Sequence, residues 1–163
     1  MIRPTRSEDT PLLLKLAEAT KVFKPQEIVA LEEVLDDYFA TTREQGHLAV
    51  TWEQGGEVLG FAYYAPSAMA DRTWYLWWIA VRKSEQAKGI GGRLLQHAEE
   101  DVKRRRGRML LIETSSLPHY AKTRAFYGRR GYEVVARVPD FYAEGDDRLI
   151  LAKRIQFTQS GQV

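Results

Sequence analysis

Apolar residues recur every three to four positions in four stretches of the chain, which is the spacing of one face of a helix. Pro25 opens the second stretch, where its fixed φ suits a first helical turn, and Gly131 follows the last, where glycine often ends a helix. The pattern predicts helices over residues 7–19, 25–42, 93–106 and 120–130.

Shorter apolar runs lack this spacing and predict strands. They cover residues 2–4, 47–52, 58–65, 73–81, 109–112, 132–138 and 148–153. Gln54-Gly55-Gly56-Glu57 predicts a hairpin turn. The run over 73–81 is apolar on both faces, which predicts a central, covered strand. The acidic and aromatic segment Pro139–Asp147 is expected to be a connecting loop, which either suits a cationic acceptor or is simply a solvated turn.

The predicted elements follow the order β-α-α-β-β-β-α-β-α-β-β, which indicates an α/β protein with a mixed sheet (α+β). We expect one central sheet of six to seven strands, flanked by about four helices. The strand over 109–112 should run parallel to the strand over 73–81, because a helix connects the two. One domain is expected over residues 1–156, followed by a polar tail over 157–163.

Composition narrows the function classes. The 163 residues are 44% hydrophobic, enough for a real core, and carry a net charge of +2, which predicts neither a nucleic-acid nor a membrane partner. The chain has no cysteine, which excludes disulfides, thiol catalysis and zinc thiolate sites. No apolar run reaches about 18 residues, the length of a membrane span. No apolar signal core follows the N-terminus, so a cytoplasmic protein is expected.

The segment Gln86–Gly92 lies between the apolar strand over 73–81 and the helix predicted to follow it. A helix start exposes backbone N–H groups, and glycines let a phosphate approach them closely. Lys88 and Arg93 would add positive charge beside such a site. The segment therefore predicts a pyrophosphate-binding loop for a nucleotide-type cofactor.

Other glycine motifs fit this segment less well. The G-x-x-x-x-G-K-[ST] string of a phosphate-binding ATPase loop is absent. A dinucleotide fingerprint begins at Gly89-Ile90-Gly91, but Leu94 occupies the place of its third glycine. Glu113 does lie at about the distance of the ribose-binding acid in that fingerprint, so this interpretation stays open. A glycine-rich turn that only starts a helix is a further alternative.

The Q-x-x-G-x-G pattern at Gln86–Gly91, preceded by Ile79-Ala80-Val81, resembles the acetyl-CoA signature of the GNAT superfamily of N-acetyltransferases. A second segment, Thr123-Arg124-Ala125-Phe126-Tyr127 with Gly131-Tyr132, resembles the family's A-x-x-F-Y-x-x-x-G-F/Y segment, with Thr123 in the alanine's place. The resemblance implies a GNAT-like fold over nearly the whole chain. It also implies acetyl-CoA as co-substrate, a primary amine of a small molecule or peptide as acceptor, and no metal.

The resemblance implies roles for particular residues. Tyr127 would donate a proton to the departing CoA sulfur, although a tyrosine on a helix can also simply pack. Backbone groups of the preceding strand would bind the pantetheine arm, and a β-bulge there would free one amide to polarise the thioester oxygen. The cofactor-binding residues would be Ile79, Ala80, Val81, Gln86, Ala87, Lys88, Gly89, Ile90, Gly91 and Gly92.

Two positions depart from the family pattern. Tyr75 stands where some members carry a catalytic glutamate, and Tyr120 stands where many carry a cofactor-contacting asparagine. Glu113 is our first substitute for the general base, although it can equally be a residue that only pairs locally. A non-catalytic acyl-CoA-binding sensor is the alternative function. The exposed C-terminal strands offer a surface on which a homodimer could form.

Overall fold

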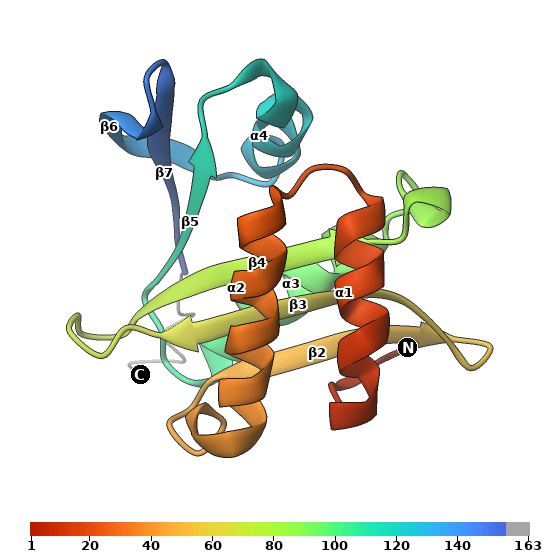
Figure 1. Cartoon of the computed structure of the whole chain (residues 1–163). Coiled ribbons are helices and arrows are strands. Elements are labelled where there is room, and N and C mark those ends of the chain that lie inside the picture. Colours follow the sequence, from red (N-terminus) through yellow and green to blue (C-terminus); the bar gives the residue numbers. More distant parts are fainter. Residues whose placement is uncertain (156–163) are drawn as a thin grey trace, which may run out of the picture. The chain divides into compact units, whose positions relative to one another are not determined.

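The computed structural model describes residues 1–155, so the tail expected over 157–163 lies outside the described residues. The described chain contains a seven-stranded mixed sheet and four α-helices, which confirms the predicted α/β class (Figure 1). The strands are β1 (Ile2–Pro4), β2 (Leu48–Gln54), β3 (Glu57–Pro66), β4 (Thr73–Val81), β5 (Met109–Ser115), β6 (Glu133–Ala143) and β7 (Asp146–Arg154). The helices are α1 (Thr10–Ala19), α2 (Pro25–Asp37), α3 (Ile90–Arg104) and α4 (Ala121–Gly128).

The sheet order is β1-β2-β3-β4-β5-β7-β6, which makes β4 the central strand, as predicted. By its internal contacts the chain divides into two compact units. The first consists of Met1–Pro66 and Leu76–Ala98, and the second of Ser67–Tyr75 and the chain from Glu99 onward. Both β4 and α3 contribute residues to each unit. The expected single domain over 1–156 stays a prediction.

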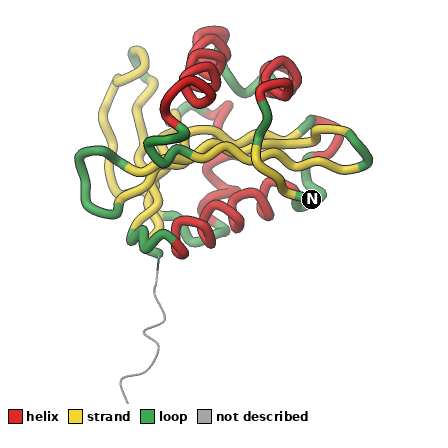
Figure 2. The backbone as a smooth tube through the Cα atoms, turned by 90° about the horizontal axis from the view of Figure 1, so that it is seen from below, coloured by secondary structure: helices red, strands yellow, loops and turns green. Residues whose placement is uncertain are grey.

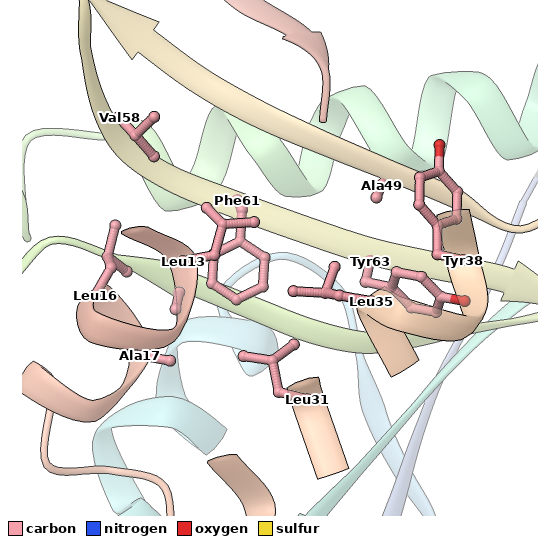
Figure 3. Packing of buried hydrophobic residues seen from close by; sticks show 11 residues of the cluster. Leu13, Leu16, Ala17, Leu31, Leu35, Tyr38, Ala49, Val58, Phe61 and Tyr63 are labelled. Atoms are coloured by element: carbon pink, nitrogen blue, oxygen red, sulfur yellow. The ribbon is translucent and has the colours of Figure 1, made fainter. Parts of the chain in front are cut away.

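In the first unit, α1 and α2 lie side by side on one face of β2 and β3 (Figure 1). Their apolar faces meet side chains of the strands in a core that is closed to solvent (Figure 3). The buried members of this core are Leu13, Leu16, Ala17, Leu31, Leu35, Tyr38, Ala49, Val58, Phe61, Tyr63 and Ala80. The two helices thus fix one face of the strands that lead to the glycine loop.

The first half of α3 covers the opposite face of these strands, so helices lie on both sides of the sheet in this unit (Figure 2). Gly60 on β3 makes the close approach possible, because a Cβ there would lie 3.0 Å from the Ala80 carbonyl oxygen and 3.1 Å from Leu94 Cδ1. Arg93 lies over the Trp52 ring, with its guanidinium carbon 5.6 Å from the ring centroid. These contacts hold the start of α3 against the sheet.

In the second unit, residues Thr73–Tyr75 of β4 pair in parallel with residues Met109–Leu111 of β5. This pairing confirms the predicted parallel arrangement of the two strands. β7 pairs antiparallel with β5 along its length, and β6 pairs antiparallel with β7 on the other side. Alternate residues of β5 and β7 are buried, which is the pattern of strands with one covered face. The buried set includes Leu110, Ile112, Leu149 and Leu151.

Two predicted boundaries are wrong in an informative way. Helix α3 begins at Ile90 rather than Arg93, because the Arg93 amide already donates a hydrogen bond to the Gly89 carbonyl (3.1 Å) and closes a helical turn over two glycines. The expected loop Pro139–Asp147 is mostly strand, since β6 extends to Ala143 and β7 begins at Asp146. A two-residue turn then suffices to connect the strands. Within the described residues, no helix is both long and apolar enough to cross a membrane.

Candidate active site

The segment after β4 turns twice before α3 begins. A short 3-10 turn covers Lys83–Glu85, and the Gln86 side-chain amide donates a hydrogen bond to the Val81 carbonyl (3.2 Å). Ala87 and Gly89 then adopt left-handed backbone conformations, with φ of 66° and 85°. This conformation is natural for glycine but costs about 1 kcal/mol or more for alanine, so the rest of the structure holds Ala87 in place.

The start of α3 presents four backbone amides without an acceptor inside the helix. The Arg93 amide donates the first hydrogen bond of the helix. The N–H groups of the four residues before Arg93 therefore have no acceptor inside the helix. These residues are Gly89, Ile90, Gly91 and Gly92, all predicted from the sequence to bind the cofactor. The Ile90 side chain is buried and anchors the turn, whereas Gln86–Gly89 are exposed. The geometry suits an anion held by main-chain N–H groups.

The middle of β4 is more accessible than its sequence predicts. Trp77 is 46% exposed, and Trp78, Ile79 and Val81 are only half-buried. Ala80 is buried against the core beneath α1 and α2. The prediction that both faces of this strand are covered is therefore correct for only part of it. No helix of the described chain shields Trp77 fully. Exposed apolar surface on a central strand is typical of a ligand site.

Tyr127 is buried near the end of α4. Its ring packs edge-on against Phe126 (centroids 5.1 Å apart) and Tyr132 (5.6 Å). Burial raises the pKa of the Tyr127 hydroxyl above its usual value near 10, so the phenol stays protonated at neutral pH. Within residues 1–155 no hydrogen-bond partner is recorded for this hydroxyl. These properties fit a proton donor whose partner is a substrate atom.

Tyr132, which packs against Tyr127, is held by Glu99 and Lys153, a group that the sequence did not predict. The Tyr132 hydroxyl donates to Glu99 Oε1 (3.0 Å), and Lys153 Nζ donates to Glu99 Oε2 (2.9 Å). Burial, reinforced by the Glu99 charge, raises the pKa of Tyr132. Glu99 lies on α3, Tyr132 lies just before β6 and Lys153 lies on β7, so only the folded chain brings them together.

Glu113 lies on β5, where its backbone is in register with Ile150 of β7. Its carboxylate accepts a hydrogen bond from the Arg148 guanidinium, and the Glu113 side chain is 18% exposed. Arg148 in turn lies over the Phe141 ring, 4.9 Å from its centroid. This ion pair agrees with the alternative in which Glu113 only pairs with a neighbouring residue. To act as a base, Glu113 would have to lose the hydrogen bond that Arg148 donates to it. Arg148 carried no signal in the sequence, because its pairing depends on the register of two strands distant in the chain.

The end of β5 and the start of α4 are tied by one side chain. Arg124 Nη1 donates to the carbonyls of Ser115 (2.7 Å) and Leu117 (2.9 Å). Tyr120, which replaces the family's asparagine, is buried and packs edge-on with His119. These contacts hold the start of the helix that carries Tyr127.

The predicted site residues fall into two groups. The strand residues 79–81 and the loop residues 86–92 belong to the first unit, where they are continuous along the chain. Glu113 and Tyr127 belong to the second unit, on β5 and α4.

Comparison with known proteins finds acetyltransferases similar to this chain. The sequence model of the acetyltransferase (GNAT) family matches residues 13–132. A crystal structure of a GNAT-family protein from Desulfovibrio desulfuricans is 32% identical, with a TM-score of 0.89 over 96% of this chain and 99% of that one. Searching the curated proteins produced no match.

Two more distant structures share the fold. An aminoglycoside 6'-N-acetyltransferase complexed with coenzyme A is 20% identical, with a TM-score of 0.78 over 98% of this chain and 99% of that one. The ribosomal-protein-S18-alanine N-acetyltransferase from Escherichia coli is also 20% identical, with a TM-score of 0.77 over 100% of this chain and 98% of that one. At this identity the likeness concerns the fold alone.

Proposed function

Because this chain belongs to the acetyltransferase (GNAT) family, we propose that it transfers the acetyl group of acetyl-CoA directly to a primary amine. The observation that carries the proposal is the run of backbone amides at Gly89–Gly92 that lack an acceptor inside the helix, placed where the Q-x-x-G-x-G loop leads into α3. Such amides bind a diphosphate without a metal. The acceptor is a small molecule or a peptide, and the predicted cytoplasmic location belongs to the same proposal.

Each group has one task in the proposed reaction. The loop amides hold the diphosphate, and the strand residues Ile79–Val81 hold the pantetheine arm with their backbone groups. One amide of that strand polarises the thioester oxygen as negative charge develops on it. Glu113 accepts a proton from the amine while the new N–C bond forms. Tyr127 gives its proton to sulfur as the C–S bond breaks, so CoA leaves as a thiol.

Substitution Gly89→Val tests the loop assignment. We expect acetyl-CoA binding to weaken by at least about tenfold, which is about 1.4 kcal/mol. A branched side chain opposes the φ of 85° and crowds the approach of the diphosphate. Isothermal titration calorimetry with acetyl-CoA measures the effect, and circular dichroism checks the fold.

Gly56→Val is the matched control for backbone strain. Gly56 has a φ of 80° and open space around its Cβ position, but it lies in the β2–β3 hairpin turn. We expect this variant to bind acetyl-CoA as the wild type does. Equal affinity in the wild type and Gly89→Val would show that the diphosphate is held elsewhere.

Substitution Glu113→Gln tests the general base. The rate should fall most at low pH, where the acceptor amine is protonated and needs a base, and should recover as the pH rises. Initial rates of thiol release across the pH range give the profile. Glu99→Gln is the matched control, because Glu99 is equally exposed (18%) and pairs with Lys153 in the same unit. A loss that is uniform with pH would leave Glu113 as a structural partner of Arg148.

A non-catalytic acyl-CoA sensor is the second candidate. It is favoured by the engagement of Glu113 with Arg148 and by Tyr75 at the position of the family's glutamate. A sensor would bind acetyl-CoA but release no thiol with any amine of a panel that includes amino acids, polyamines, aminoglycosides and peptides. Turnover with one of these amines excludes it.

A further inference from the structure

Glu113 and Arg148 form an ion pair on the more open face of β5 and β7. In the ladder between these strands, Glu113 lies opposite Ile150. Arg148 lies opposite Ser115, so the two charged side chains are diagonal neighbours on one face. Most buried residues of the two strands lie on the other face, whereas the side chains of Glu113 and Arg148 stay 18% and 25% exposed. A small ligand in solution can therefore reach both charges.

Arg148 offers more donors than the described chain has acceptors for. A guanidinium carries N–H groups on three nitrogens in a fixed fork, and the carboxylate that pairs with it here is Glu113. The Arg148 Nε is buried and has no hydrogen-bond partner in the described part of the chain. Asp147 does not serve it, because its carboxylate accepts from Arg137 and from the Asp140 amide. An unpaired buried donor is costly, so a second anion bound to Arg148 would be stabilising.

Phe141 leaves room for such an anion. The guanidinium carbon of Arg148 lies over the Phe141 ring, 4.9 Å from its centroid. A guanidinium that stacks on an aromatic ring keeps its edges for carboxylates, which bind in its plane. The Phe141 side chain is half-exposed and offers an apolar contact to the carbon atoms of a ligand. One face of the strands thus carries a carboxylate, a cation that lacks acceptors and an apolar wall.

We propose that the acceptor is a free α-amino acid, with its carboxylate on Arg148 and its amine at Glu113. This inference rests on the proposed acetyl transfer, in which Glu113 accepts the proton of the amine. A single carbon separates the amine from the carboxylate of an α-amino acid, and a single hydrogen bond separates Glu113 from Arg148. One small molecule can therefore engage both residues. Polyamines, aminoglycosides and peptide N-termini lack a carboxylate at this position.

The carboxylate of the substrate also releases the base. Without substrate, the guanidinium of Arg148 occupies the Glu113 carboxylate. When the guanidinium turns toward an incoming carboxylate, its hydrogen bond to Glu113 is exchanged for hydrogen bonds to the substrate, and the Nε gains an acceptor. Glu113 then takes one proton from the substrate ammonium, and the neutral amine attacks the thioester. An amine without a carboxylate leaves Glu113 paired and should react slowly.

Matched acceptors test the substrate class. The common L-amino acids are compared with their carboxamides, which keep the amine and the side chain but lack the negative charge. For at least one amino acid, kcat/KM should exceed that of its amide by about tenfold to a hundredfold, the range for hydrogen bonds to charged groups. The amide has the less basic amine, so intrinsic reactivity at neutral pH favours the opposite order. Initial rates of thiol release measure both values.

Substitution Arg148→Gln separates substrate binding from a purely structural ion pair. The kcat/KM for the amino acid should fall to that of the amide, and the value for the amide should rise, because Glu113 is no longer occupied. A structural role predicts a loss with both acceptors. Arg148→Lys keeps a cation beside Glu113 but lacks the fork, so it should lower the preference even if Arg148→Gln fails to fold. Arg137→Gln is the matched control, since it removes another paired arginine of the same unit, and should leave the preference unchanged.

Calorimetry distinguishes a failure of this inference from a failure of acetyl transfer. With coenzyme A present, the wild type should bind the amino acid more tightly than its amide, and Arg148→Gln should bind the two alike. Acetylation of amines without preference for a carboxylate would overturn the amino-acid assignment and leave acetyl transfer intact. An unchanged preference in Arg148→Gln would overturn the role of Arg148. A calorimetric preference without any turnover would support the amino-acid site and contradict acetyl transfer.

Discussion

Substitution Tyr127→Phe should lower kcat by about 100-fold, the usual contribution of a positioned acid or base. The hydroxyl is the only atom group removed, and burial keeps it protonated in the native protein, so the loss falls on the departure of the CoA sulfur. The KM for acetyl-CoA should change little, because the proposed binding of the diphosphate involves the loop amides and not Tyr127. Steady-state kinetics with a thiol reagent measure both constants.

The fold should survive this change. Within residues 1–155 no hydrogen-bond partner of the Tyr127 hydroxyl is recorded, so its removal leaves no buried group unpaired. Tyr132→Phe is the matched control, since it removes a neighbouring buried phenol that bonds to Glu99 instead. We expect Tyr132→Phe to lower the free energy of unfolding while kcat stays close to the wild-type value. Wild-type kcat in Tyr127→Phe would reduce Tyr127 to a packing residue.

Substitution Gly107→Ala should destabilise the protein by about 3 kcal/mol, at the upper end of what overpacking of a core commonly costs. A Cβ at this position would lie 2.4 Å from Val102 Cγ1 and 2.6 Å from Trp74 Cδ1, and both neighbours are buried. The backbone is also fixed here, because the Gly107 amide donates to the Val102 carbonyl (2.8 Å) at the end of α3. Arg106, with φ of 61°, occupies the left-handed position of this helix-ending motif.

Thermal unfolding measures this effect. For a chain of this length, about 3 kcal/mol corresponds to a fall in Tm of roughly 6–12 °C. Gly128→Ala provides the control, because no atom lies within 4 Å of its Cβ position and its backbone tolerates alanine. That variant should unfold at or slightly above the wild-type temperature. Equal Tm values for Gly107→Ala and the wild type would mean that Val102 and Trp74 shift without cost.

Local patterns were enough to locate most elements. The strands β1 and β4 have the predicted bounds, because short apolar runs and flanking polar residues specify them. The errors lie where tertiary contacts extend or begin an element. β6 extends past Pro139 to Ala143, which pairs with Asp146 at the start of β7. Helix α3 takes in Gly91 and Gly92 despite their weak helix propensity.

The sequence by itself determined the order of elements, the glycine loop at a helix start and the family pattern around Tyr127. Each of these depends on residues that are neighbours along the chain, so backbone geometry and hydrophobic spacing suffice to predict them. Only the tertiary structure decided that Glu113 pairs with Arg148, that Tyr132 is held by Glu99 and Lys153, and that Trp77 and β6 remain exposed. These features depend on strand register and on which faces the helices cover, and both are set by contacts between residues far apart in the sequence.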